Sequence, residues 1–282
     1  MGFNYNFMRF PGFRDRALTL SYDDGTVHDK RLAEIMRKNG VRGTFNLNSA
    51  SFGKGRRMTL EEAKELFADD FFEVAVHGYV HYPLTSISKE DLGAATAEIA
   101  IDRFNLEREF GRMVRGMAYA CGEYNDKIVD MLRMCGIVYS RTCIRTESFD
   151  IPTDWLRLPS TCHHECPRLM ELAEEFLKPT DPDKYWRVEP KLFYLWGHSY
   201  EFADRDNWEV IERFLERVGN NDEVWYATNM QVYEYVKAYD NLIFSSDMSM
   251  VYNPSAIDVY IRFYKENVLV GAGKTAKITR RD

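Results

Sequence analysis

The sequence has no run of basic residues, no long apolar stretch, and no internal repeat or low-complexity segment. Binding to nucleic-acid phosphates needs a basic face, and the net charge of -7 at pH 7 argues against such a partner. A helix that spans a bilayer needs about 20 predominantly apolar residues, so we expect no membrane segment. The N-terminus also lacks a basic leader followed by an apolar core, which predicts a cytoplasmic protein.

Cysteine is scarce as well, because the chain has only five, all between Cys121 and Cys166. An odd number at irregular spacing does not fit the disulfide framework of a small secreted domain, so we expect reduced thiols. What the chain does have is the composition of a globular protein, with 45% hydrophobic and 29% charged residues. Its 282 residues are enough to bury one large core or two smaller ones.

Short apolar runs alternate with stretches of helical period over most of the chain. Strands are expected over 17–22, 42–48, 72–76, 114–119, 137–143, 155–159, 192–196 and 223–227. Helices are expected over 29–39, 59–69, 89–110, 125–134, 167–177, 207–218 and 231–239, the third starting after Ser88 with Asp91 as capping-box partner. The alternation predicts an α/β fold, an irregular (β/α) barrel of about seven parallel strands over residues 1–240. Strands over 243–252, 258–264 and 267–278 predict a small C-terminal antiparallel β extension, residues 241–282.

Acidic and imidazole side chains follow two of the predicted strands, where the loops of a βα barrel converge. The first strand ends in Ser21-Tyr22-Asp23-Asp24-Gly25, and both carboxylates can face one site only if the backbone leaves the pleat, which Gly25 permits. A later strand is followed by His77-Gly78-Tyr79-Val80-His81, whose spacing suits two ligands on one metal. Alone, the first motif is often a bare turn and the second often two packed histidines. Together they favour a catalytic zinc site with positions left for water and substrate.

A third histidine, His198, stands where the apolar strand over 192–196 stops. Taken alone, it is more often a hydrogen-bonded structural histidine. Beside a metal site, an imidazole that titrates near neutral pH is suited to protonate a departing amine as a general acid.

The three motifs, taken together and in this order, resemble those of the NodB-type polysaccharide deacetylases, carbohydrate esterase family four, over roughly residues 17–240. The resemblance implies that Asp24, His77 and His81 bind a divalent metal, with zinc expected first and cobalt, nickel or manganese as alternatives. It implies that Asp23 is the base that deprotonates metal-bound water and that His198 is the acid. The backbone N–H of Cys121 then corresponds to the family's oxyanion donor.

The chain departs from the family at the arginine that orients the base, because Ala118 occupies that position. We hypothesise that Arg141, at the end of the next strand, reaches Asp23 instead; the alternative is a surface ion pair. The family's Asp-Trp motif is expected, weakly, at Asp154-Trp155.

The segment Cys162-His163-His164-Glu165-Cys166 allows two interpretations. It is either a second metal site or, as we expect, an active-site loop in which His163 or His164 contacts substrate. Nearby Glu201 could orient a histidine or bind a sugar hydroxyl, although a solvated loop position is the default. Stacking on sugar rings is expected from aromatic residues near the predicted mouth, with burial in the core as the alternative: Tyr22, Tyr119, Trp155, Trp196 and Tyr200.

The resemblance implies a metal-dependent hydrolase that removes N-acetyl groups, or alternatively O-acetyl groups, from a sugar or oligosaccharide. Two rivals remain. A related amidohydrolase that cleaves a non-sugar amide would use the same residues. The absence of the motif arginine also allows a catalytically inactive protein that binds metal and carbohydrate.

Overall fold

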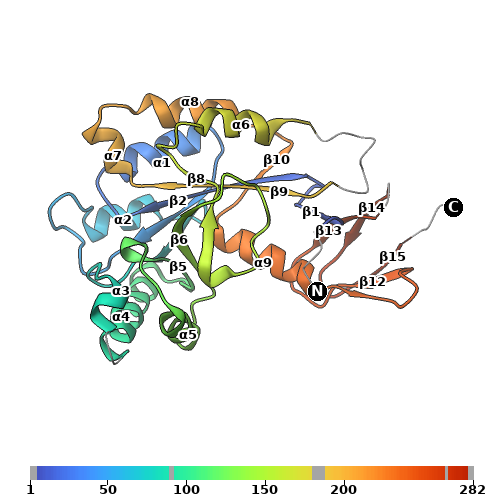
Figure 1. Cartoon of the computed structure of the whole chain (residues 1–282), viewed down its shortest axis with the longest axis horizontal. Coiled ribbons are helices and arrows are strands. Elements are labelled where there is room, and N and C mark those ends of the chain that lie inside the picture. Colours follow the sequence, from blue (N-terminus) through green and yellow to red (C-terminus); the bar gives the residue numbers. More distant parts are fainter. Residues whose placement is uncertain (1–4, 89–91, 180–187, 264–265, 279–282) are drawn as a thin grey trace.

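The computed structural model describes residues 5–88, 92–179, 188–263 and 266–278 (Figure 1). The strands are β1 (Met8–Arg9), β2 (Arg16–Asp23), β3 (Gly43–Leu47), β4 (Phe72–Val76), β5 (Gly116–Ala118), β6 (Tyr139–Arg145), β7 (Leu158–Ser160), β8 (Cys162–His163), β9 (Lys191–Gly197), β10 (Val224–Tyr226), β11 (Ile243–Phe244), β12 (Met250–Tyr252), β13 (Val259–Phe263), β14 (Glu266–Val270) and β15 (Thr275–Lys277). The helices are α1 (Asp29–Lys38), α2 (Leu60–Leu66), α3 (Leu84–Ser88), α4 (Gly93–Phe110), α5 (Asp126–Met134), α6 (Leu169–Leu177), α7 (Ser199–Asp204), α8 (Glu209–Val218) and α9 (Asn229–Asp240), with 3-10 turns η1 (Ala120–Gly122) and η2 (Trp155–Arg157).

The main sheet is parallel and closes into a barrel. Its strands follow the order β7-β6-β5-β4-β3-β2-β9-β8, and β10 pairs with the first residues of β2. Strands β7 and β8 are separated only by Thr161, whose N–H donates to Tyr194 O at 2.9 Å. Because β7 pairs with β6 and β8 pairs with β9, this one segment joins the two ends of the sheet. The predicted (β/α) barrel is therefore confirmed, with seven strand positions when 158–163 counts as one.

The helices cover the outside of the barrel. Figure 1 shows α1, α6 and α8 together on one side and α3, α4 and α5 on another. The expected cap of α2 is present, because Thr59 Oγ1 accepts from Glu62 N–H at 3.2 Å and Glu62 Oε2 accepts from Thr59 N–H at 2.8 Å. Such a reciprocal pair satisfies two backbone donors that the first turn of a helix leaves without partners. For α4, the expected start at 89 and the cap with Asp91 lie outside the described residues.

Two local expectations are wrong. The predicted strand over 155–159 begins later, because the Asp154 side chain accepts from Leu156 N–H at 3.2 Å and caps η2. The predicted strand over 243–252 is a hairpin of β11 and β12, because Asp247 Oδ1 accepts from Ser249 N–H at 3.0 Å and turns the chain. Side chains that bond to nearby backbone amides favour turns over extended structure.

The C-terminal antiparallel strands are confirmed, in two small sheets of order β1-β13-β14 and β11-β12-β15. Strand β1 comes from the N-terminal segment, so both ends of the chain contribute to this region. In Figure 1 these strands lie near the start of β2 and away from its other end, where the predicted site residues follow. The division of the chain at residue 240 stays a prediction. No helix in the described part of the chain is long and apolar enough to cross a membrane.

Close packing inside the barrel generates a test at Gly116. A Cβ atom added there would lie 2.2 Å from ring atoms of Tyr139, which is fully buried and donates its hydroxyl to Glu73 at 2.7 Å. We expect Gly116→Ala to lower the free energy of unfolding by about 1–3 kcal/mol, measured from the urea midpoint. In Gly271→Ala, the control, the new Cβ would meet nothing closer than 3.4 Å, and the midpoint should not move. Equal losses in both variants would contradict this packing.

Candidate functional site

The end of β2 presents two adjacent carboxylates to one site. Asp23 is the last residue of the strand, and the backbone leaves the pleat at Asp24, whose φ is +85°, and at Gly25, whose φ is +63°. The Asp24 N–H donates to Asn46 O at 2.9 Å, which anchors this left-handed turn on β3. Neighbouring residues on a regular strand would face opposite ways. The turn therefore lets both buried carboxylates reach the mouth of the barrel.

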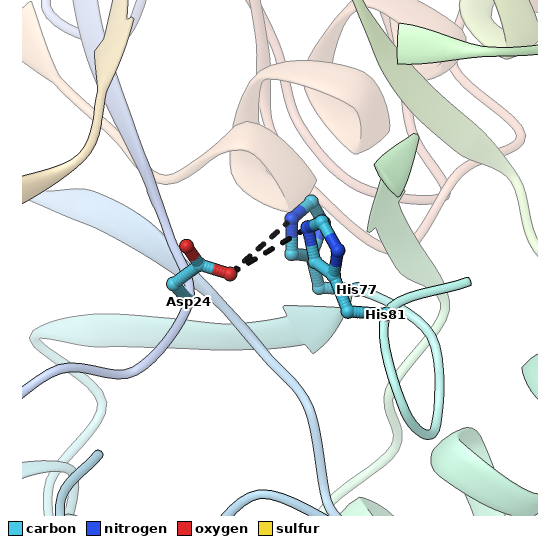
Figure 2. Close-up of side chains that lie close together, drawn as sticks. All are labelled: Asp24, His77 and His81. Atoms are coloured by element: carbon cyan, nitrogen blue, oxygen red, sulfur yellow. Dashed lines mark ion pairs between the residues drawn. The ribbon is translucent and has the colours of Figure 1, made fainter. Parts of the chain in front are cut away.

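Asp24 faces both histidines of the loop after β4 (Figure 2). Its Oδ1 lies 3.9 Å from His77 Nε2 and 3.6 Å from His81 Nε2. His77 Nδ1 lies 2.9 Å from Ala118 O, to which it donates, so Nε2 is left with a lone pair. Among the described residues, neither His77 Nε2 nor Asp24 Oδ1 has a hydrogen-bond partner, although both are buried. An acid and two imidazoles with free lone pairs fit a divalent cation.

The loop that carries the two histidines is held by α4. Glu98 Oε1 accepts from Val80 N–H at 2.8 Å and from Tyr82 N–H at 3.1 Å. One helical turn later, Asp102 Oδ2 accepts from His77 N–H at 3.2 Å. Both acids are buried on the inner face of α4, and we missed them in the sequence. The available signal was two acids four residues apart on a face that otherwise packs against the core.

Charge at the metal-site residues is balanced by the protein. Burial lowers the pKa of His77, so the ring is held neutral, as a metal ligand must be. Arg57, which the sequence did not single out, places Nη2 at 3.1 Å from Asp24 Oδ1. The Arg57 guanidinium therefore already places a positive charge beside this carboxylate oxygen.

Asp23 is held by an arginine from β6. Arg141 Nη2 donates to Asp23 Oδ2, and Asn46 Nδ2 donates to Asp23 Oδ1 at 2.8 Å. Arg141 is fully buried and stacks on Trp196, with 4.0 Å from the guanidinium carbon to the ring centroid. The hypothesised contact is thus present, and the alternative of a surface ion pair is wrong. Its origin is strand register, because Ala118 and Arg141 are direct partners in the pairing of β5 with β6.

The protonation states of Asp23 and His198 follow from these contacts. Burial alone would raise the pKa of Asp23, but Arg141, with His77 and His198, outweighs burial and lowers it to about 2. For His198, burial alone would lower the pKa, but Glu201 and Asp23 outweigh it and raise the pKa. His198 Nε2 lies 3.9 Å from Asp23 Oδ2, so an ionised acid and a proton-carrying imidazole share the mouth.

The structure brings some of the other predicted residues to this mouth. Trp196, His163 and Tyr200 are partly exposed, and the ring centroids of Trp196 and Tyr200 lie 5.8 Å and 5.1 Å from that of His198. Cys121 lies in η1, directly after β5, with a φ of +57° and an exposed side chain.

Three predicted sugar-stacking residues are corrected, because their rings are buried in hydrophobic clusters. Tyr22 stacks on the His164 ring, and Tyr119 donates its hydroxyl to Leu156 O at 2.8 Å. Trp155 is buried and packs edge-on against Tyr233. The expected Asp-Trp motif fails with it, since Asp154 pairs with Arg157 at 2.7 Å. These side chains support the fold and have no surface to offer a sugar.

Comparison with known proteins finds a matching family for part of the chain. The family described as polysaccharide deacetylase matches residues 12–140, whereas no curated protein matches the chain. A Mycobacterium smegmatis protein described as a candidate polysaccharide deacetylase has a similar structure, with a TM-score of 0.58 and 16% identity over 83% of this chain and 94% of that chain. The Xyl-CE4 domain of a multidomain xylanase from the hindgut metagenome of Trinervitermes trinervoides gives a TM-score of 0.52 and 14% identity over 79% of this chain and 92% of that one. These likenesses support the barrel fold, and residues 12–140 match the family described as polysaccharide deacetylase.

Proposed function

We propose that this protein is a metal-dependent deacetylase that hydrolyses the N-acetyl group of a sugar or oligosaccharide. The observation that carries the proposal is the different surroundings of the two adjacent carboxylates at the end of β2, Asp23 and Asp24. Asp24 faces His77 and His81, while its neighbour Asp23 is ionised and lies between His77, 3.7 Å away, and His198, 3.9 Å away. Metal-dependent hydrolysis of an amide can use each of these parts: a cation site, a base and an acid.

Asp24, His77 and His81 would hold the metal, for which zinc fits the nitrogen and oxygen donors best. When bound there, a divalent cation would lower the pKa of water from ~15.7 towards ~7 and polarise the acetyl carbonyl. The orientation of the two imidazole rings is set by the protein chain itself. Glu98 and Asp102 fix the histidine loop through its backbone, so the imidazole nitrogens keep their direction without help from the ligand.

Asp23 would take the proton from the attacking water. Arg141 and Asn46 each hold one of its oxygens, which fixes the carboxylate plane towards the mouth. The same positive charge makes Asp23 a weak base, so the transfer depends on an acidified water. On the far side of the acetyl group, the Cys121 N–H would stabilise the developing oxyanion.

His198 would then protonate the leaving nitrogen, since its raised pKa keeps a proton available near neutral pH. Acetate and a free amine are the products. Trp196, Tyr200 and His163 surround His198 with partly exposed rings, a surface on which a sugar ring can stack.

The inactive alternative loses its main support. It was suggested by the missing arginine at Ala118, and Arg141 supplies a guanidinium to Asp23 from the adjacent register position. An amidohydrolase with a non-sugar substrate would use the same groups, and a substrate screen separates the two.

Asp23→Asn removes the base and keeps the cation site. We expect the release of acetate from N-acetylated chito-oligosaccharides to fall by about 10²–10⁴-fold, because a positioned base contributes that much to the rate. Metal content, measured by elemental analysis on the same sample, should stay as in the unaltered protein. Unchanged acetate release would rule out Asp23 as the base, and no release by the unaltered protein from any acetylated sugar would overturn the proposed function.

Arg141→Ala tests whether the guanidinium from β6 serves Asp23. We expect acetate release to fall by about 10–100-fold, as for the loss of other groups that orient a reacting residue. Arg145→Ala, on the same strand but exposed and paired with Glu147, is the control and should be neutral. Adding Ala118→Arg to Arg141→Ala should restore part of the lost rate, because the two positions lie side by side. A rate unaffected by Arg141→Ala would contradict this role.

A further inference from the structure

Three imidazoles, one of them that of the proposed acid His198, surround the carboxylate of Glu201. Glu201, on α7, places Oε2 at 3.2 Å from both His163 Nε2 and His164 Nε2, and at 3.4 Å from His198 Nδ1. The same oxygen accepts from the His198 backbone N–H at 3.2 Å. This cluster explains what the Cys162-His163-His164-Glu165-Cys166 segment does, which the sequence left between two interpretations.

The segment is shaped to deliver both rings to Glu201. Strand β8 ends at His163, and the turn that follows keeps His164 on the same side, with its N–H donating to Trp196 O at 2.9 Å. The His164 ring is almost fully buried between Tyr22 and Phe202, with ring centroids at 5.8 Å and 4.1 Å. A Cβ at Gly197 would lie 1.9 Å from His164 Nδ1, so only glycine leaves room for this ring against β9.

Hydrogen bonding argues against a second metal in the cluster, although His163, His198 and Glu201 lie close enough together for one. The Glu165 N–H donates to His163 Nδ1 at 3.2 Å, so Nδ1 must carry the lone pair. A neutral imidazole has one donor and one acceptor nitrogen, so Nε2 carries the hydrogen that faces Glu201. A nitrogen that donates cannot also bind a cation. The cluster is therefore a group of three imidazoles gathered around one carboxylate.

We propose that His163 and His164 are positioning residues that act on His198 through Glu201. The inference rests on the proposed function only in naming His198 as the acid. With Nε2 of each ring 3.2 Å from Oε2, the two histidines hold the carboxylate in place beside His198. His198 Nδ1 lies 3.4 Å from the same oxygen, which leaves Nε2 as the nitrogen that faces Asp23 and the mouth.

The charges around His198 agree with this arrangement. Burial lowers the pKa of His164 to about 4, so its ring is a neutral donor near neutral pH. Burial would raise the pKa of Glu201, but the hydrogen bonds from the histidines outweigh it and hold the carboxylate ionised. The other titratable groups that act on His198 or Glu201 come from the end of β2 and from the start of α7: Tyr22, Asp23, Asp24 and Tyr200. Arg141 holds the pKa of Asp23 below its usual range, so this carboxylate is ionised and favours the protonated imidazole.

The test follows the pKa and the ring tautomer of His198 by NMR in the full chain freed of metal. Glu201→Gln should lower the pKa of His198 by about one unit or more, because an opposite charge within a few ångströms raises it by that much. Asp204→Asn, which removes an exposed carboxylate from the same helix, is the matched control and should leave the pKa unchanged. An unchanged pKa in Glu201→Gln would overturn the proposal.

A double-mutant cycle shows whether the two histidines act through Glu201. His163→Leu should lower the pKa of His198 and weaken its preference for the Nδ1–H tautomer, whereas His163→Gln, which keeps an N–H donor, should retain both. In the Glu201→Gln background, His163→Leu should cause no further shift. His164→Leu should have the same effects. If the protein does not fold with leucine at the buried position 164, the partly exposed His163 still provides the test.

The positioning role would be overturned if His163→Leu shifted the His198 pKa as much in the Glu201→Gln background as in the unaltered protein. It would also be overturned if His163→Leu raised that pKa. A second zinc ion per chain that is lost in Glu201→Gln would overturn it as well. These measurements need no substrate and no bound metal. If the protein released no acetate from any sugar, the proposed function would be wrong, but the measured effect of His163 and Glu201 on the pKa of His198 would still hold.

Discussion

The site depends on one break in backbone geometry, at the end of β2. On a regular strand, Asp23 and Asp24 would point to opposite faces and only one could reach the mouth. The left-handed conformation of Asp24, followed by that of Gly25, turns the second carboxylate back beside the first. The two acids then have different neighbours, since Asp24 faces both histidines of the loop while Asp23 faces His77, Arg141 and His198.

Each buried acid in the mouth has its own compensation. Arg141 pairs with Asp23, Arg57 with Asp24, and imidazole N–H groups surround Glu201. Without such partners, low-dielectric surroundings would protonate these groups. The pKa values of Asp23 and Glu201 stay below their usual range, so both carboxylates remain charged close together.

Much of the barrel and the centre of the site could be predicted from the sequence. Strand and helix periods gave the α/β alternation, and the strand-end motifs gave Asp24, His77, His81 and Asp23. The contact of Arg141 with Asp23 was predicted from its place on the strand next to Ala118, where the family's arginine is absent. In the parallel pairing of β5 with β6, the two residues are direct partners. Local pattern is informative here because side chains at parallel strand ends share one edge.

The remaining features depend on contacts that pattern does not contain. Burial of Tyr22, Tyr119 and Trp155 is set by which helices and strands cover them, and composition cannot separate a core aromatic from a sugar-binding one. Closure of the barrel by β7 and β8 rests on short strands interrupted by Thr161, too brief for a period to show. The Glu201 network joins β8 to α7, whose residues are about 40 positions apart, so its donors are identified only from their distances.

Whether a metal ion binds between Asp24, His77 and His81 can be observed in crystals grown with zinc. Diffraction data collected at the zinc absorption edge should show one anomalous peak per chain, about 2.0–2.2 Å from an Asp24 carboxylate oxygen and from Nε2 of both histidines. In crystals of His81→Ala the peak should weaken or disappear. Absence of a peak at these three residues, or a peak found only among His163, His198 and Glu201, would contradict the assignment of the metal site.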